Sequence, residues 1–131
     1  MLLDTHIWLR WLSPADAKLP TEVIDKLQAD DADLAVSAVS CWEVAYLAKR
    51  GRLVLPLPLP LAEWLREALT GSGISCISLD SSIAAAAAEL SDIHRDPADR
   101  FIIATALATR RRLLTLDSVI PNYPELTGHL A

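Results

Sequence analysis

Short apolar runs alternate with longer amphipathic stretches along the whole chain. A short apolar run is typical of a buried strand, and apolar positions three or four apart are typical of a helix. The runs that predict strands are Met1–Leu3, Leu34–Val36, Ile74–Leu79 and Leu113–Leu116. The stretches that predict helices are Thr5–Leu12, Thr21–Ala29, one from Ser37 or Ser40 to about Arg50, Leu61–Leu69, Ser81–Leu90 and Pro97 to about Thr109. Val54–Pro60 alternates Pro with Leu and is expected to be an extended connector, and Asn122–Ala131 a loop and a loose tail.

This alternation of strands and helices predicts a parallel sheet with helices on both faces, which is a three-layer α/β/α sandwich. The chain has 131 residues, of which 52% are hydrophobic, and its composition shows no linker or repeat. We therefore expect residues 1–131 to form a single domain. Right-handed crossovers would place the C-terminal ends of all the strands at one edge of the sheet, where such folds bind ligands.

Acidic residues occur where the apolar runs end or where the following helices begin. Asp4 follows the first run and Asp117 follows the last one. Glu43 lies near the start of one predicted helix, and Asp99 lies in the first turn of another. Carboxylates gathered at one edge would repel one another unless protons or metal ions lay between them. The pattern therefore favours a site for Mg²⁺ or Mn²⁺, which prefer oxygen ligands.

Each of these carboxylates also has a purely structural interpretation. Asp4 suits the N-cap of the helix that follows it, and Asp117 suits a turn. The role of Glu43 depends on which serine caps its helix. Ser40 as the N-cap would place Glu43 in a capping box. Ser37 as the N-cap would let Glu43 project from the second turn, near the edge of the sheet. The sequence leaves both arrangements open.

Asp96 raises the same question, because it stands directly before Pro97. This position predicts an N-cap, and Asp99 then stands where the acid of a capping box would be. Residues three apart share a helix face, so both acids can still point into one cavity. His94 lies beside them and could contact substrate, although we expect a structural or solvated role for it. The histidines and cysteines lack the spacing typical of zinc sites.

The charge of the chain narrows the classes of partner. The net charge of −5 argues against a protein that coats nucleic acid through bulk electrostatics. It does not exclude a nuclease, because metal ions can invert the local field. Basic residues cluster at Lys49, Arg50 and Arg52, at Arg95 and Arg100, and at Arg110, Arg111 and Arg112. Each cluster fits either a solvated helix end or a phosphate contact.

The remaining composition bears on the compartment. Every apolar stretch is shorter than the roughly 18 residues that a membrane span requires. No signal peptide is visible after Met1, so we expect a cytoplasmic protein without a membrane segment. Cys41 and Cys76 each lie in an apolar stretch, and we expect two buried thiols rather than a disulfide in that compartment.

Several segments resemble the PIN-domain ribonucleases, and within them the VapC-type toxins of bacterial toxin–antitoxin pairs. These segments are MLLDTHIWLRWL, VSAVSCWEVA followed by KRGRL, HRDPADRFIIATAL and LLTLD. They occur in the family's order and span nearly the whole chain. The resemblance implies an α/β/α sandwich and a metal-dependent endoribonuclease whose acids match Asp4, Glu43, Asp99 and Asp117. It also implies an assisting role for Asp96. The common family pattern has Phe at the position of Ala98, a change expected to affect packing more than chemistry.

These matches imply a mechanism. We expect Asp4 and Asp99 to hold Mg²⁺ directly, with Asp117 and Asp96 as further or water-mediated ligands. The ion would polarise the scissile phosphate and activate a water, which Glu43 orients unless it holds a second ion. The residues expected to hydrogen-bond these acids are Thr5, Ser40 and Thr115. The candidates for phosphate contacts are Arg95 and Arg100.

The family resemblance also implies partners. Such toxins are usually homodimers, and each binds a small antitoxin whose tail covers the active site. The substrate is expected to be single-stranded or loop RNA, in which the bases are accessible. The alternatives are a DNA nuclease, a PIN-like module that only binds its partner, and a Mg²⁺-dependent phosphatase-like hydrolase. The presence of all the family's acids argues against the module. His6 argues against the phosphatase, whose pattern has an Asp at that position.

Overall fold

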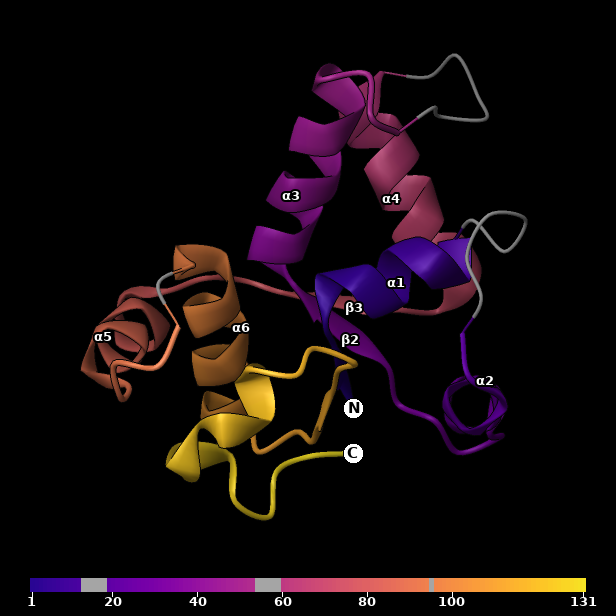
Figure 1. Ribbon diagram of the computed structural model, residues 1–131. Helices are drawn as coiled ribbons and strands as arrows, with labels where there is room; N and C mark the ends of the chain where they lie inside the picture. The colour runs from indigo at the N-terminus through magenta and orange to yellow at the C-terminus, as the bar shows by residue number, and fades with distance from the viewer. Residues whose placement is uncertain (13–18, 54–59, 95) are drawn as a thin grey trace.

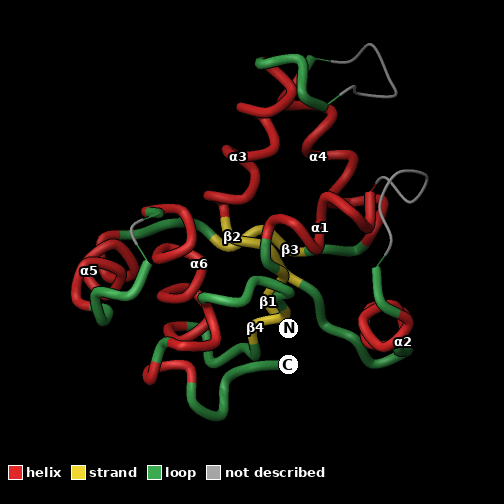
Figure 2. The backbone as a smooth tube through the Cα atoms, viewed as in Figure 1, coloured by secondary structure: helices red, strands yellow, loops and turns green. Residues whose placement is uncertain are grey.

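The computed structural model describes residues 1–12, 19–53, 60–94 and 96–131. Its centre is a sheet of four parallel strands in the order β3-β2-β1-β4. The strands are β1 (Leu2–Leu3), β2 (Ala35–Ser37), β3 (Ser75–Ile77) and β4 (Leu113–Leu114). Figure 2 shows them in the middle of the molecule, with helices around them. Every predicted strand is present, although β3 and β4 end earlier than predicted because the chain turns away to start α5 and the Asp117 turn.

All the predicted helices are present as well. They are α1 (Thr5–Leu12), α2 (Thr21–Gln28), α3 (Ala38–Lys49), α4 (Leu61–Ser72), α5 (Ser81–Glu89) and α6 (Pro97–Ala108). Gly51 has φ 70° and ends α3, as predicted, because glycine adopts the left-handed region without strain. The helix α4 continues through Gly71 and ends at Gly73. The connector predicted at Val54–Pro60 falls on residues 54–59, outside the described residues. None of the described helices has the length and apolar character needed to cross a membrane.

The helices cover both faces of the sheet, which confirms the three-layer α/β/α sandwich. Successive side chains of a strand point to opposite faces. Leu2 therefore packs in one core with α5 and α6, and Leu3 packs in a second core with α1, α2, α3 and α4. The same alternation places Leu113 in the first core and Leu114 in the second. Figure 1 shows the two groups of helices on either side of the strands.

The C-terminal segment is packed against the domain, which corrects the expectation of a loose tail. It forms two short 3-10 helices, η1 (Ile120–Asn122) and η2 (Pro124–Leu126). The side chains of Ile120, Tyr123 and Leu126 are at most 1% exposed. Their spacing of three residues matches the period of a 3-10 helix and places all of them on one face. Leu130 then pairs with Leu113 and covers the edge of β4.

The two cysteines differ from the expectation of buried thiols. Cys41 on α3 is half-buried and Cys76 on β3 is exposed, because β3 is the edge strand of the sheet. Both are free thiols, as expected, with their sulfur atoms 3.8 Å apart. Burial and the neighbouring Cys76 raise the pKa of Cys41 to about 12, so this thiol stays protonated at neutral pH.

The order of the strands fixes where a ligand site is expected. From β1 the chain builds the sheet toward β2 and β3 on one side, and β4 lies on the other side. The order therefore reverses between β1 and β4, and parallel sheets of this kind bind ligands at the C-terminal side of such a reversal. Asp4 follows β1 directly, and Thr115 follows β4 directly.

Candidate functional site

Asp4 lies at the reversal point, and its carboxylate joins the ends of two strands. The residue is only 2% exposed. Thr115 Oγ1 donates a hydrogen bond of 2.7 Å to Asp4 Oδ2. Thr115 Oγ1 also accepts a hydrogen bond of 3.0 Å from the backbone N–H of Asp117. Burial raises the pKa of Asp4, and the bond from Thr115 partly opposes this effect. The hydroxyl thus stabilises the charged form of a carboxylate that burial disfavours.

Glu43 is held in place by two hydroxyl side chains. Ser37 caps α3 by accepting a 3.2 Å bond from Val39 N, so Glu43 lies in the second turn and the capping box at Ser40 is not formed. Thr5 Oγ1 donates to Glu43 Oε1 over 2.6 Å and lies 2.8 Å from Ser40 Oγ. Because the single proton of Thr5 goes to Glu43, Ser40 is the donor to Thr5. Burial raises the pKa of Glu43, the bond from Thr5 partly opposes this effect, and the charges of Asp96 and Asp4 add to it.

Asp96 and Asp99 begin α6 with different tasks. Asp96 Oδ1 accepts a bond of 3.0 Å from Ala98 N, which confirms the predicted N-cap. The backbone N–H of Asp96 donates to His94 Nδ1, so it is not available for a capping box with Asp99. The Asp99 side chain is 15% exposed and lies 3.2 Å from His94 Nε2. Asp99 therefore faces the site rather than the end of its own helix.

Asp117 contributes to a turn and to the site. Its Oδ1 accepts bonds of 2.7 Å from Val119 N and 3.1 Å from Ile120 N, as expected of a turn residue. One ligand atom each of Asp117, Asp99 and His94 lie within 4.8 Å of one another. Among the described residues Asp4, Glu43 and Asp96 are not part of this closest group, but their charges act on it. We call Asp4, Glu43, Asp96, Asp99 and Asp117 together the acidic site.

The electrostatics of the acidic site are those of uncompensated negative charge. Burial and then the charges of Asp96, Asp4 and Glu43 raise the pKa of Asp99 to about 7, although His94 opposes the shift. The charge of Asp117 likewise adds to the raised pKa of Asp4. Acids from the ends of β1 and β4 and from α3 and α6 are thus close enough to repel one another. Neutralisation by protons or by a cation would relieve this repulsion.

His94 is a site residue that the sequence interpretation did not select. Its Nδ1 accepts from Asp96 N, so the proton of the ring lies on Nε2 and points at Asp99. Its backbone N–H donates a bond of 2.7 Å to the hydroxyl of the buried Tyr123. His94 lies in a loop, and its position is fixed by Tyr123, which is distant in the sequence. A periodic sequence pattern therefore does not identify it. The run of His94, Asp96 and Asp99 was the only local signal.

The structure describes one of the two arginines predicted to contact phosphate, Arg100. Arg95 lies outside the described residues. Arg100 donates to the carbonyl oxygens of Leu90 and Ser91, both at 2.9 Å, and so holds the end of α5. These bonds direct the Arg100 donors at the protein's own backbone, and the phosphate contact of Arg100 stays a prediction. Cations at a helix C-terminus are favoured by the helix dipole.

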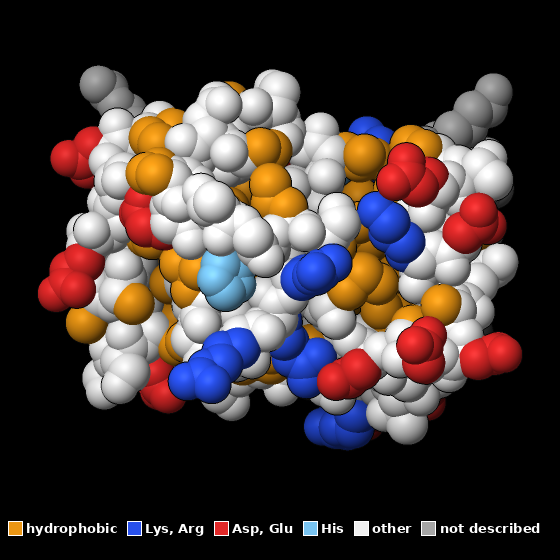
Figure 3. Space-filling view, turned by 90° about the horizontal axis from the view of Figure 1, so that it is seen from below, with side chains coloured by type: hydrophobic (Ala, Val, Ile, Leu, Met, Phe, Trp, Pro, Cys, Tyr) orange, Lys and Arg blue, Asp and Glu red, His pale blue; other side chains and the backbone are white. Residues whose placement is uncertain are grey.

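The basic group Arg110–Arg112 lies at the opposite edge of the sheet. Arg112 O accepts from Leu2 N at the start of β1, whereas the acidic site follows the ends of the strands. Arg111 pairs with Asp33 at 3.1 Å. Figure 3 shows that Lys and Arg side chains gather near the middle of the face seen from below. This basic group therefore lies at the opposite end of the strands from the acidic site.

The acidic site fits a small divalent cation. Its donors are carboxylate oxygens, which Mg²⁺ and Mn²⁺ prefer. Burial and then the charges of neighbouring acids raise the pKa values of Asp4 and Asp99, and a bound cation would oppose both effects. His94 directs its Nε2 proton to Asp99, so its role is to orient a ligand rather than to supply a lone pair. Asp96 already caps α6 through Oδ1, which favours an outer or water-mediated contact for it.

Comparison with models of known protein families shows to which family the chain belongs. The model of the PIN domain family matches residues 1–126. The chain belongs to the PIN-domain family. A curated relative, Ribonuclease VapC22 from Mycobacterium tuberculosis (strain ATCC 25618 / H37Rv), is 35% identical over 118 residues. The match covers 89% of this chain and 86% of the relative.

Solved structures agree with the PIN fold. A VapBC2 structure from Rickettsia felis, bound to a DNA fragment from its promoter, has a TM-score of 0.69 at 17% identity. A toxin–antitoxin complex from Klebsiella pneumoniae has a TM-score of 0.66 at 23% identity. Each match covers 95% of this chain and 92% of the other. FitAcB from Neisseria gonorrhoeae has a TM-score of 0.60 at 22% identity, covering 91% and 88%. At these identities the likeness concerns the fold alone.

Proposed function

We propose that this PIN domain is a metal-dependent endoribonuclease toxin that an antitoxin neutralises. The observation that carries the proposal is the acidic site, which lies at the reversal point of the sheet and has unbalanced negative charge. The relative that is 35% identical bears the name of a ribonuclease, and two of the structural relatives are described as toxin–antitoxin or VapBC structures. These relationships support the proposal independently of the site geometry.

The residues of the acidic site have distinct tasks in the proposed reaction. Asp4, Asp99 and Asp117 would hold Mg²⁺ or Mn²⁺, which when bound supplies Lewis acidity at the scissile phosphate. Glu43 orients the attacking water and takes up its proton, because its raised pKa makes it a stronger base than an ordinary carboxylate. Thr5 fixes the direction of the Glu43 carboxylate.

Two further groups keep the acids in place without touching the substrate. Thr115 holds Asp4, and His94 holds Asp99, so each carboxylate has one orienting donor. The proposed substrate is unpaired RNA, whose phosphates can approach an open edge of the sheet and whose bases are accessible. The test includes DNA as well as RNA.

The test is cleavage of a mixed pool of RNA, and of DNA of the same sequences, with Mg²⁺, Mn²⁺ or EDTA. Wild type is compared with Asp4→Asn and with Asp25→Asn, which removes an exposed acid on α2. We expect RNA cleavage by wild type and Asp25→Asn with either metal and none by Asp4→Asn. Cleavage that survives EDTA, or that Asp4→Asn retains, would contradict the proposal. Cleavage of DNA alone would replace it by a DNA nuclease.

Partners and setting complete the proposal. An antitoxin should form a stable complex with this chain and suppress its cleavage of RNA. The toxin should also be a homodimer, which light scattering of the purified protein measures directly. We place the protein in the cytoplasm, because the proposed RNA substrate and antitoxin are both located there. A monomeric protein that still cleaves RNA would refute the proposed homodimer but not the proposed nuclease activity.

A further inference from the structure

The outer face of α3 carries a column of aromatic and cationic side chains. Trp42, Tyr46 and Arg50 are spaced four residues apart and therefore lie above one another. The rings of Trp42 and Tyr46 stack with centroids 5.4 Å apart and planes at 24°. Arg50 Cζ lies 4.9 Å from the centroid of Tyr46, and its guanidinium donates to Tyr46 Oη over 2.6 Å. Trp42 is 59% exposed and Tyr46 43%, so this column is not part of either core.

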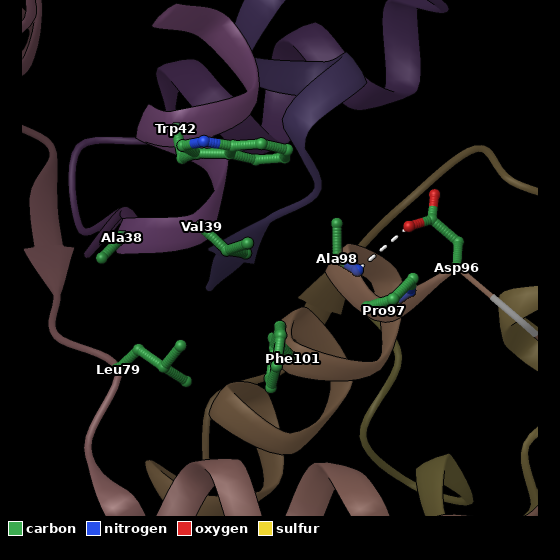
Figure 4. A pocket seen from close by; sticks show the side chains of 8 residues that line it. All are labelled: Ala38, Val39, Trp42, Leu79, Asp96, Pro97, Ala98 and Phe101. Carbon is green, nitrogen blue, oxygen red and sulfur yellow. Dashed lines mark hydrogen bonds between the residues drawn. The ribbon is translucent and has the colours of Figure 1, made fainter. Parts of the chain in front are cut away.

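The base of this column forms one wall of a pocket. The pocket has a volume of about 530 Å³, and its lining is largely apolar. Figure 4 shows the ring of Trp42 facing across the opening toward Val39, Ala98 and Phe101, with Asp96 at one end. A flat group that entered between Trp42 and this floor would continue the stack that already contains Tyr46. Aromatic rings favour offset stacking at such distances.

The pocket and the acidic site share a border. Asp96 belongs to both, Trp42 directly precedes Glu43, and Ala98 directly precedes Asp99. A flat group in the pocket would therefore lie beside the acids that the proposed function uses. At the far end of the column, α3 ends in exposed Lys49 and Arg50, followed by Arg52. The column thus leads from an acidic site to a local group of positive charge.

We propose that an unpaired base of the RNA stacks on Trp42 in this pocket, while its backbone follows Tyr46 and Arg50 toward the basic end of α3. This inference rests on the proposed ribonuclease function and assigns its substrate-binding surface. Stacked aromatic rings interleaved with cations are the usual platform for single-stranded nucleic acid. The cationic end and the border with the acidic site favour RNA over a protein partner on this face.

Binding of a short fluorescent RNA, measured by anisotropy in EDTA so that no cleavage occurs, tests the stacked base. Trp42→Ala should weaken binding by about 5- to 150-fold, because stacking on one ring is worth about 1–3 kcal/mol. Trp42→Phe should largely restore it. An RNA with one abasic position at the bound base should bind wild type as weakly as the intact RNA binds Trp42→Ala. Leu130→Ala, which truncates an exposed apolar side chain beside β4, is the matched control and should bind like wild type.

The backbone path is tested through the salt dependence of the same binding. Arg50→Ala should reduce the slope of log affinity against log salt by about 1, as expected for the loss of one phosphate contact. Arg66→Ala removes an exposed arginine on α4 and should leave the slope unchanged. Ala98→Leu should narrow the pocket and weaken binding of the intact RNA, but not of the abasic RNA.

The outcomes separate this inference from the proposed function. Wild-type cleavage of RNA together with equal RNA affinity for Trp42→Ala and wild type would overturn the stacking site and leave the nuclease. A wild type that cleaves no RNA would instead refute the proposed function. Light scattering and antitoxin binding test whether this face binds protein instead. If Trp42→Ala alters the oligomeric state or abolishes antitoxin binding while its affinity for RNA is unchanged, the face is a protein interface and the RNA proposal is wrong.

Discussion

Thr115 Oγ1 donates a 2.7 Å hydrogen bond to Asp4 Oδ2 across the point where the strand order reverses. The bond joins the end of β4 to the end of β1 and supplies a buried carboxylate with a donor. Thr115→Val keeps the shape of the side chain and removes that donor. We expect its affinity for Mn²⁺ to fall by about 10- to 100-fold, as for other groups that orient metal ligands. Calorimetric titration with Mn²⁺ measures the change.

A second threonine provides the control for this prediction. Thr105 is buried on α6, and its hydroxyl donates to the carbonyl of Phe101 within the helix. Thr105→Val should change stability but not affinity for Mn²⁺. Equal affinities for Thr115→Val and wild type would show that the hydroxyl does not orient Asp4.

The cap formed by Asp96 can be separated from its charge. Asp96→Ala removes the bond to Ala98 N and should lower the free energy of unfolding by about 1 kcal/mol. Asp96→Ser keeps a capping oxygen without the carboxylate and should restore most of this stability in urea denaturation. If Asp96 is an outer ligand at most, Asp96→Ser should also retain most of the affinity for Mn²⁺. A complete loss of binding in Asp96→Ser would make Asp96 a direct ligand.

The metal-free protein should become less stable as the pH rises. Asp99 has a pKa of about 7 in the folded state against 3.8 as its ordinary value, and the pKa values of Asp4 and Glu43 are raised too. Between these limits the folded state holds protons that the unfolded state has released, so stability falls with rising pH. Thermal unfolding in EDTA should show a lower midpoint at about pH 8 than at about pH 5.

Two comparisons assign this pH effect to the acidic site. Asp99→Asn should flatten the dependence, and Mg²⁺ should stabilise the wild type more at high pH than at low pH because it competes with protons. The effect of Glu125 on stability has the opposite sign, because hydrogen bonds from Ser91 lower its pKa from the ordinary value of 4.5. This contribution is lost only at acidic pH, as the pH falls below about 4.5. A midpoint that rises between pH 5 and pH 8 in EDTA would contradict the repulsion inferred here.

The elements of the fold could be predicted because they depend on local patterns. Short apolar runs became strands, and the N-cap at Asp96 and the helix end at Gly51 follow from rules that involve only neighbouring residues. The gathering of Asp4 and Asp117 could be predicted from topology, since the ends of parallel strands meet at one edge. The sequence could not choose between Ser37 and Ser40, because both caps satisfy the same local chemistry.

The remaining features depend on contacts between distant residues. The orientation of His94 depends on Tyr123, which is 29 positions away in the chain. Arg100 has a long side chain, and only the folded structure shows that it reaches the carbonyls of α5. The packed C-terminal segment was missed because a period of three is neither that of an α-helix nor that of a strand. These residues look like ordinary loop or surface positions in the sequence.

The end of α6 offers a test of backbone strain. Arg110 has φ 54°, in the left-handed region, and its N–H donates to Leu107 O while Arg111 N donates to Ala106 O. This is a Schellman motif, in which glycine is the favoured residue. Arg110→Gly should therefore raise the free energy of unfolding by about 1 kcal/mol in urea. Arg110→Ala keeps the strain and should show no gain; an equal gain in both variants would assign the effect to the lost charge.

The central claim is that the acidic site binds a divalent cation through Asp99. Titration calorimetry of Mn²⁺ into metal-free wild type, Asp99→Asn and Asp25→Asn tests it most directly, with unfolding curves to show that all three are folded. We predict saturable binding by wild type and Asp25→Asn and a loss of at least tenfold in affinity for Asp99→Asn. Equal affinities for folded wild type and Asp99→Asn would contradict the account.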